Sequence, residues 1–95
     1  DETNEPAIIK RDNNSYIVQG STLIQELNKE LKKEFIQRNN EYLTLAGFII
    51  HYLGRLPATA AKSIYNGVEF EIVDMDGIKI DKVIIKKLPE NITTP

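Results

Sequence analysis

Cysteine and tryptophan are absent from this sequence, and histidine and methionine occur once each. The lack of cysteine excludes disulfides and thiolate metal sites. A lone histidine, His51, excludes a multi-histidine metal site within one chain. No hydrophobic run approaches the ~20 residues that span a bilayer, and no signal-peptide pattern is present. A cytoplasmic protein without a resident metal is therefore the simplest expectation.

A strong charge of either sign is also missing. The chain has 12 basic and 14 acidic residues, a net charge of −2 and a pI of about 5.4. This balance provides no general positive field for nucleic acid or anionic lipid. The length of 95 residues and the hydrophobic fraction of 41% suit one globular domain. Because an initiator methionine is lacking, we expect the chain to be a piece of a longer protein.

The beginning of the chain predicts a β-hairpin. Residues 1–6 are polar and acidic and are expected to be a linker. Two β-prone runs, 7–11 and 15–19, then flank Asp12, Asn13 and Asn14, which are residue types that favour turns.

A helix is expected to follow this hairpin. Thr22 and Gln25 have the spacing of a capping box, and Ser21 is a competing cap. The helix should start near Leu23 and end between residues 28 and 35. Its apolar face is predicted to consist of Leu23, Ile24, Leu27 and Leu31.

The longest apolar run, residues 44–57, predicts the central helix. Its apolar positions recur with helical spacing. They are Tyr42, Leu45, Ala46, Ile49, Ile50 and Leu53. Asn40 can cap the start, Gly54 suits the left-handed residue at the end, and Pro57 prevents the helix from resuming. Gly47 costs about 1 kcal/mol inside a helix, so we expect the other helix or a strand to approach closely there.

The last third of the chain predicts a three-stranded meander. Residues 58–61 should form a loop and 62–65 a short strand, followed by the hairpin turn Asn66-Gly67. The next strand alternates between polar and apolar positions. Its inward residues should be Val68, Phe70 and Ile72.

A second turn at Asp76-Gly77 should lead into the last strand. Ile78 and Ile80 share one face of that strand, but Val83 and Ile85 have the opposite parity. A bulge near Asp81 and Lys82 would return all four to the core. Residues 89–95 are expected to be a tail.

These elements predict one α+β domain, residues 7–88. The order is two strands, two helices and three strands, so a mostly antiparallel sheet should carry both helices on one face in a two-layer sandwich. An edge strand of that sheet could pair two chains into a homodimer.

Candidate catalytic groups are few. His51 lies beside Phe48 and Arg55, off the apolar stripe, and is expected at the surface. No serine stands in a nucleophile-elbow pattern. Asp74, Asp76 and Asp81 lack the further ligands of a calcium loop, which favours turn chemistry.

Phosphate-binding and nucleic-acid-binding patterns are also lacking. The five glycines are not spaced as in a nucleotide-binding loop. Lys79, Lys82, Lys86 and Lys87 form a basic strip, which we interpret as protection of an edge strand rather than a nucleic-acid surface.

Three segments resemble the transporter-associated CorC/HlyC domain family. Residues 12–21 are similar to the hairpin that opens that domain. Residues 44–47, Thr-Leu-Ala-Gly, and 53–57, Leu-Gly-Arg-Leu-Pro, are similar to its central helix and the exit from it. The positions that carry this family motif are Thr44, Leu45, Ala46, Gly47, Leu53, Gly54, Arg55 and Pro57.

The resemblance implies a domain at the C-terminus of a bacterial protein, behind a pair of CBS domains. Many such proteins also have a membrane domain and are linked to magnesium and cobalt efflux, and others are called hemolysins. The implied role is non-catalytic regulation of ion transport in cis. The fold would be similar to part of the flavin-binding, PCMH-like domains of FAD oxidoreductases. No FAD phosphate motif is present, so no cofactor is expected, and a module for FAD or an adenine nucleotide is the alternative.

One position departs from the family pattern. The family usually has a glycine a few residues after the proline, where this chain has Ala60. If that glycine takes a positive φ, the loop of this chain must turn differently.

Overall fold

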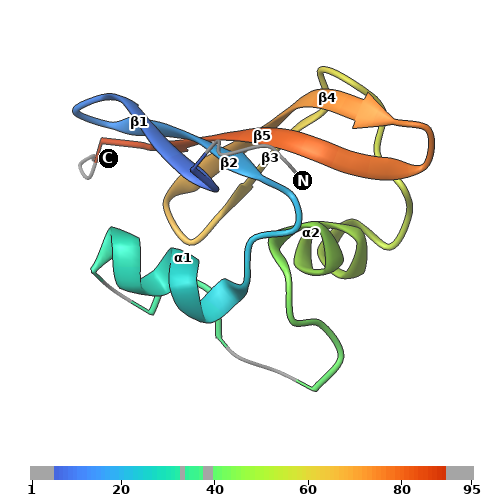
Figure 1. The fold of residues 1–95 in the computed structure, drawn as a ribbon, viewed down its shortest axis with the longest axis horizontal. Helices are drawn as coiled ribbons and strands as arrows, with labels where there is room; N and C mark the ends of the chain where they lie inside the picture. The colour runs from blue at the N-terminus through green and yellow to red at the C-terminus, as the bar shows by residue number, and fades with distance from the viewer. Residues whose placement is uncertain (1–5, 33, 38–39, 90–95) are drawn as a thin grey trace, which may run out of the picture.

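A five-stranded antiparallel sheet forms one layer of the fold, and two helices form the other (Figure 1). This computed structural model describes residues 6–32, 34–37 and 40–89. The elements are β1 (Ile8–Asp12), β2 (Ser15–Gln19), α1 (Ile24–Leu31), α2 (Leu45–Leu53), β3 (Lys62–Tyr65), β4 (Val68–Asp76) and β5 (Lys79–Lys87). The predicted α+β sandwich is confirmed. Most of the predicted linker and tail lies outside the described residues.

The strand order across the sheet is β1-β2-β5-β4-β3. The last strand of the chain therefore lies in the centre, between the N-terminal hairpin and the β3-β4 hairpin. One register line crosses all five strands and joins Ile9 to Ile17, Ile17 to Ile84, Ile84 to Glu71 and Glu71 to Lys62. Because every strand pair is antiparallel, the side chains on this line share one face of the sheet.

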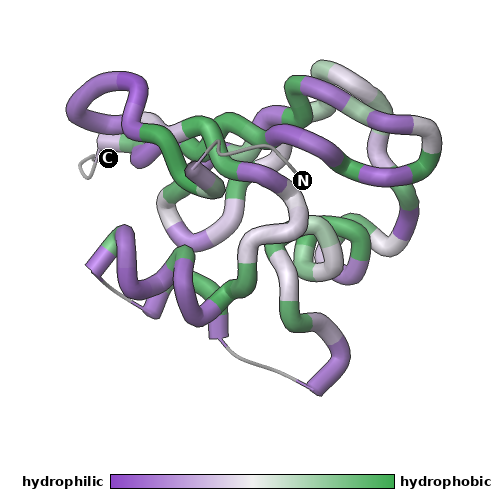
Figure 2. The backbone as a smooth tube through the Cα atoms, in the orientation of Figure 1, coloured by the Kyte–Doolittle hydropathy of each residue, from purple (hydrophilic) through white to green (hydrophobic). Residues whose placement is uncertain are grey.

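The hydrophobic core lies between the sheet and the helices. The side chains that the sheet buries there are Tyr16, Val18, Val68, Phe70, Ile72, Ile80, Val83 and Ile85. Hydrophobic residues run through most of α2, whereas α1 alternates between hydrophobic and hydrophilic positions (Figure 2). The opposite face of the sheet has no covering layer among the described residues (Figure 1).

The predicted bulge between β4 and β5 is confirmed. The register shifts between Ile72 and Asp74 and again between Asp74 and Met75, where Lys82 and Ile80 stand opposite. The shift lets Ile80 and Val83 both point into the core although they are three positions apart in the strand.

The two turns of the meander differ in how well they were predicted. Asn66 and Gly67 have φ of 55° and 78°, as a type I′ hairpin requires. The second turn is Gly77-Ile78 rather than Asp76-Gly77, because Asp76 pairs with Lys79. Ile78 is consequently at the tip of the turn and 81% exposed, so its predicted place in the core is wrong.

The predicted cap of α1 is also wrong. Leu23 occupies the N-cap without a side-chain hydrogen bond and is 40% exposed. The Thr22 hydroxyl is buried without a partner among the described residues. The reason is tertiary: the Thr22 carbonyl accepts from the Leu45 amide at 2.9 Å, and this contact with α2 holds Thr22 in place ahead of the helix.

Thr44, not Asn40, caps α2. Its Oγ1 accepts a hydrogen bond from the Gly47 amide at 3.1 Å. Gly54 ends the helix in the left-handed conformation, as predicted, with φ of 76°. The buried face includes Phe48, whereas Ile50 is exposed. The apolar stripe is therefore rotated from the predicted one, because Phe48 packs on aromatic rings from β3 and β4.

Close approach of another element occurs at Gly20, not at Gly47. A Cβ on Gly20 would overlap the carbonyl oxygen of Ile80 on β5 and lie 3.3 Å from the Ala46 Cβ. The nearest neighbours of a Cβ on Gly47 would be Thr44 and Tyr42, at 3.3 Å each, and neither belongs to another helix or strand. The predicted approach of a helix or strand to Gly47 is therefore wrong.

The loop after α2 contains an alanine in a conformation that favours glycine. Ala60 has φ of 75°, and its amide donates to the Ile72 carbonyl at 2.7 Å. The Ile72 amide in turn donates to the Ala61 carbonyl at 3.0 Å. These bonds to β4 hold Ala60 in the left-handed region, so the alanine does not make the loop avoid a positive φ.

Ala60→Gly should therefore raise the free energy of unfolding by up to about 1 kcal/mol, because glycine adopts a positive φ without a Cβ penalty. Urea denaturation followed by circular dichroism measures the change. Ala58→Gly is the matched control in the same loop. Ala58 has no positive φ, so this control should lose stability. A loss for Ala60→Gly equal to that of the control would contradict the predicted strain.

Candidate functional site

The residues of the family motif mostly serve the packing of α2. Leu45 is buried in the core, Leu53 packs against it, and Pro57 is buried. Thr44 and Gly54 cap the two ends of α2. The Ala46 amide donates to the Gly20 carbonyl at 2.9 Å and so links α2 to the end of β2. Arg55 is exposed. Most of these positions therefore stabilise the fold, and Arg55 is the exposed side chain among them that could contact a partner directly.

An aromatic cluster extends from the core to the surface around Phe48. The Phe48 ring lies 4.9 Å from the Tyr65 ring and 5.7 Å from the nearly parallel Tyr52 ring, centroid to centroid. Phe70 and Tyr42 lie against it at 5.9 and 5.3 Å. Their positions in the sequence gave no signal, because the rings come from α2, β3, β4 and the segment before α2. Burial, and secondarily Tyr65, raise the pKa of the Tyr42 phenol above its ordinary value.

His51 is exposed, as predicted. Its Nδ1 lies 3.5 Å from the Glu41 Oε1, and its ring is 5.2 Å from the Tyr42 ring. Among the described contacts of His51, none is with a nucleophilic serine or threonine side chain. This arrangement fits a surface contact between a histidine and a carboxylate better than proton transfer to a substrate.

The aspartates of the β4-β5 hairpin each stand near a lysine. Asp74 is opposite Lys82 and Asp76 is opposite Lys79. The Asp81 Oδ2 lies 3.3 Å from the Lys82 Nζ. Within residues 6–32, 34–37 and 40–89, no three His, Asp or Glu side chains are grouped to hold a metal ion.

The predicted role of the basic strip as edge protection is wrong. β5 is the central strand, with β2 and β4 on either side. Lys86 stands opposite Glu69, and the Lys87 Nζ lies 5.9 Å from the centre of the Tyr16 ring. The lysines are interspersed with carboxylates, so they do not form a continuous surface for a nucleic acid.

The loop of the first hairpin is structural. The Asp12 Oδ1 accepts from the Asn14 amide and from the Ser15 hydroxyl, both at 2.9 Å. The amide hydrogen bond of Asn14, and then that of the Ser15 hydroxyl, hold the pKa of the Asp12 carboxyl below its ordinary value. The carboxylate is used by the turn and does not point to a ligand site.

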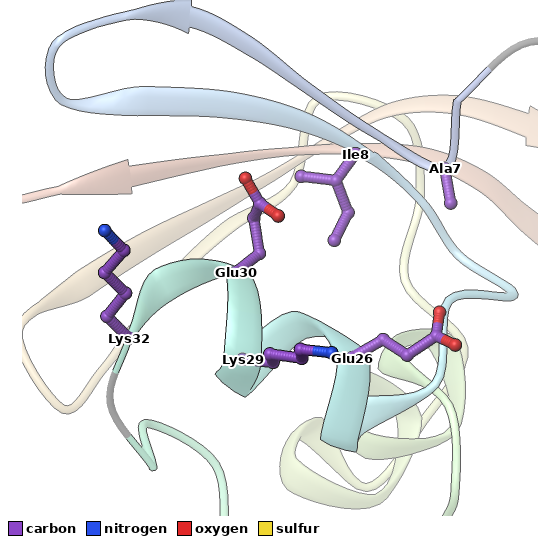
Figure 3. Close-up of a pocket in the computed structure, with 6 residues that line it drawn as sticks. All are labelled: Ala7, Ile8, Glu26, Lys29, Glu30 and Lys32. Atoms are coloured by element: carbon purple, nitrogen blue, oxygen red, sulfur yellow. The ribbon is translucent and has the colours of Figure 1, made fainter.

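A cleft of about 470 Å³ opens between α1 and the start of β1 (Figure 3). It is lined by Ala7, Ile8, Glu26, Lys29, Glu30 and Lys32. Glu30 projects from α1 towards β1, whereas Lys29 extends along the helix towards Glu26 (Figure 3). This lining has no aromatic ring to stack on a flavin or adenine and no glycine-rich turn to hold phosphates. The cleft suits a polypeptide segment with a charged side chain better than a nucleotide.

No helix within the described ranges has the length and apolar character needed to cross a membrane. α1 and α2 have 8 and 9 residues.

Comparison with known proteins gives a consistent result. Residues 9–89 match the family profile described as the transporter associated domain, CorC_HlyC. A UPF0053 protein from Synechocystis is 40% identical over 99% of this chain, which spans 21% of that relative. A polyamine export protein from Salmonella typhimurium is 30% identical over 96% of the chain, which spans 20% of the relative. The chain thus spans about a fifth of the length of these curated relatives.

Solved structures with the same fold include the transporter associated domain CorC_HlyC of a Xylella fastidiosa hemolysin. It is 34% identical, with a TM-score of 0.77 over 90% of this chain and 100% of that one. A second structure of that domain is a complex with Mg²⁺ and Mn²⁺, at 34% identity and a TM-score of 0.75 over 88% of this chain and 100% of that one. The transporter associated domain of a CBS domain protein from Porphyromonas gingivalis is 21% identical, with a TM-score of 0.78 over 88% of this chain and 100% of that one.

Proposed function

Because this chain belongs to the CorC/HlyC family of transporter-associated domains, we propose that it is a non-catalytic interaction domain that modulates export by a larger protein in cis. One observation carries the proposal. The chain spans 21% and 20% of relatives that extend well beyond it, one of them named as a polyamine export protein. An element of this size with its own core can affect transport through contacts with the remaining parts of the same protein.

The geometry of the domain supports an interaction role. Its family motif is used for packing, and the acidic and basic side chains of its meander face one another across strands. Among the described residues, its open features are surfaces: the uncovered face of the sheet, the sheet edges and the cleft beside α1. Surfaces of this kind fit protein contacts better than chemistry on a small substrate.

The proposed partners are a CBS pair and a membrane domain of the same chain, on the cytoplasmic side of the membrane. The structural relative from Porphyromonas gingivalis is described as part of a CBS domain protein. A cationic cargo is common to the polyamine export relative and to the magnesium and cobalt efflux that the family resemblance implies. We therefore propose a cation as the exported species.

Deletion of residues 7–88 from the parent protein should change the rate of cation export by at least about 3-fold, an effect of about 0.7 kcal/mol on the rate-limiting step. Export is measured in vesicles that contain equal amounts of inserted protein. Supplying the domain as a separate chain should restore the rate incompletely, because a covalent link provides a high effective concentration. Unchanged export and assembly after the deletion would refute the proposal.

The alternative, a module for FAD or an adenine nucleotide, has support from fold similarity alone. Under the proposed function, titration with FAD or ATP at about 1 mM should give no saturable heat. Concentrations of this order would reveal even a site with a Kd of about 1 mM, which corresponds to about −4 kcal/mol of binding free energy. A Mg²⁺ titration observed through amide chemical shifts belongs to the same experiment, because a relative has been solved with that ion. Saturable binding of a nucleotide would replace the proposed function by the alternative.

A further inference from the structure

The two edges of the sheet are not equivalent. On β1, the Gln19 amide donates to the Ala7 carbonyl at 2.9 Å, and Ile9 stands opposite Ile17. Hydrogen-bonded and non-hydrogen-bonded pairs alternate along an antiparallel ladder. Ala7 and Ile9 therefore direct their backbone groups to β2, and Ile8 and Lys10 direct theirs away from the sheet.

The β3 edge is partly closed by a side chain. Hydrogen-bonded and non-hydrogen-bonded pairs alternate along β3, starting from the Asn66-Gly67 turn. The backbone groups of Lys62 and Ile64 therefore lie on the outer side of this strand. The Tyr52 hydroxyl donates to the Ile64 carbonyl at 2.8 Å. No such hydroxyl stands on the Ile8 or Lys10 carbonyl within the part of the chain that the structure describes. β1 is the edge that is open to another strand.

We propose that β1 pairs with β1 of a second copy of this chain, antiparallel and about a two-fold axis at Ile9. The two sheets then join into one sheet of ten strands. In this register Ile8 of each copy stands opposite the partner's Lys10, and each such pair exchanges two hydrogen bonds. The outward-facing amides and carbonyls of Ile8 and Lys10 in both copies then all have a hydrogen-bond partner.

The neighbouring registers are less favourable. An axis at Lys10 would place two lysines directly opposite each other, which is destabilising. An axis at Ile8 would place Pro6, which has no amide hydrogen, opposite Lys10. The register at Ile9 avoids both problems.

Ile9 adds apolar contact at the two-fold axis. Its side chain is 41% exposed on the uncovered face of the sheet, in register with Ile17 and Ile84. Pairing at Ile9 joins this row to the same row of the second copy. Six isoleucines then form one continuous strip, with the two most exposed of them in contact at its centre.

Charge complementarity supports the same partner. Ile8 and Lys10 lie on the helix-facing side of β1, and Ile8 lines the cleft beside α1. The partner's Lys10, opposite Ile8, would enter this cleft next to Glu30, which projects towards β1 (Figure 3). The structure shows no ion pair between Glu30 and another described residue. Two such lysine–glutamate pairs would form, related by the two-fold axis.

A contact of one short strand on each copy buries little surface, so the isolated domains should associate weakly, with a Kd of about 0.1–1 mM. Tethering two copies through the rest of a longer protein would strengthen the contact without new interactions. Self-association through β1 is independent of the proposed effect on export.

Disulfide trapping tests the register, since the chain contains no cysteine. In the proposed pairing, Ile9 and its symmetry mate form a non-hydrogen-bonded pair with Cα atoms about 4.5 Å apart, within disulfide range. Ile9→Cys at about 1 mM should form a disulfide dimer at least ~10-fold faster than Ile64→Cys, an exposed position on β3. Equal rates for the two variants would overturn the proposal.

A proline pair tests the edge without a new thiol. Lys10→Pro removes an outward amide hydrogen and no hydrogen bond within the domain, and Lys62→Pro does the same on β3. Sedimentation equilibrium up to about 2 mM should show at least ~10-fold weaker association for Lys10→Pro and no change for Lys62→Pro. Unaltered circular dichroism establishes that both variants fold. A wild-type domain that remains monomeric at about 2 mM would overturn the inference.

A charge exchange tests the cleft contact. Glu30→Lys should weaken association about 5-fold, because two exposed ion pairs are lost in each dimer. Adding Lys10→Glu to that variant should restore the affinity of the wild type. Failure of the double variant to recover would overturn the assigned contact.

Discussion

Replacing Gly20 by alanine should lower the free energy of unfolding by about 3 kcal/mol or more. The new Cβ would overlap the carbonyl oxygen of Ile80, which belongs to the backbone of the central strand and cannot rotate away. Gly20 also donates to the Asp81 carbonyl and accepts from the Ala46 amide, both at 2.9 Å. A shift that relieved the overlap would strain both bonds, each worth about 1 kcal/mol.

Urea denaturation of Gly20→Ala measures this loss, and the melting temperature should fall by more than ~12 °C for a domain of this size. Gly47→Ala is the control, since the nearest neighbours of its Cβ would be Thr44 and Tyr42 at 3.3 Å. Higher helix propensity offsets that contact, so the change should be below about 1 kcal/mol. Equal losses for the two variants would show that Gly20 is not the point of close approach.

Asn28→Asp should cost about 2–3 kcal/mol at neutral pH. The Asn28 Nδ2 donates to the Ile36 carbonyl at 2.8 Å, and its Oδ1 accepts from the Phe35 and Ile36 amides at 3.1 Å. These bonds hold two buried residues of the connection after α1. An aspartate would direct an oxygen at the Ile36 carbonyl, which leaves an acceptor unsatisfied and places a charge beside it.

The destabilisation by Asn28→Asp should depend on pH. The Phe35 and Ile36 amides favour the ionised carboxyl at position 28, whereas partial burial and the facing Ile36 carbonyl favour the protonated form, which could donate to that carbonyl. We expect the second pair of effects to be larger, so the folded state should raise the pKa of this carboxyl above its unfolded value of about 3.9. The deficit relative to the wild type should be small below that value and grow as the pH rises through the folded pKa. Asn40→Asp, at an exposed position, is the control and should change stability by less than about 0.5 kcal/mol. A similarly small effect of Asn28→Asp at neutral pH would contradict the role of Asn28.

Local signals were sufficient for the strands and for the first turn of the meander. Asn66-Gly67 specifies its own backbone conformation, because both residues tolerate a positive φ. The change of parity between Ile80 and Val83 revealed the bulge, because a strand with one buried face cannot slip by one residue without exposing its apolar side chains. Gly54 likewise marked the end of α2 correctly.

Several errors occurred where residues distant in sequence meet. Thr22 has the chemistry of a cap, but its carbonyl is held by the Leu45 amide and its hydroxyl is buried. Phe48 was predicted to lie off the apolar stripe because the rings that cover it belong to β3 and β4. Asn28 gave no signal at all, since its partners are backbone groups seven and eight residues away.

By itself, the sequence determined the order of elements, the α+β class and the family, because periodicity, turn residues and the motif around α2 are local properties of the chain. Only the tertiary structure decided that β5 lies in the centre of the sheet, that Gly20 is the point of close approach and that β1 lies at an edge of the sheet. Strand order depends on which distant segments pair, and the pattern of a single strand does not encode its neighbours. The candidate contact surfaces result from that order.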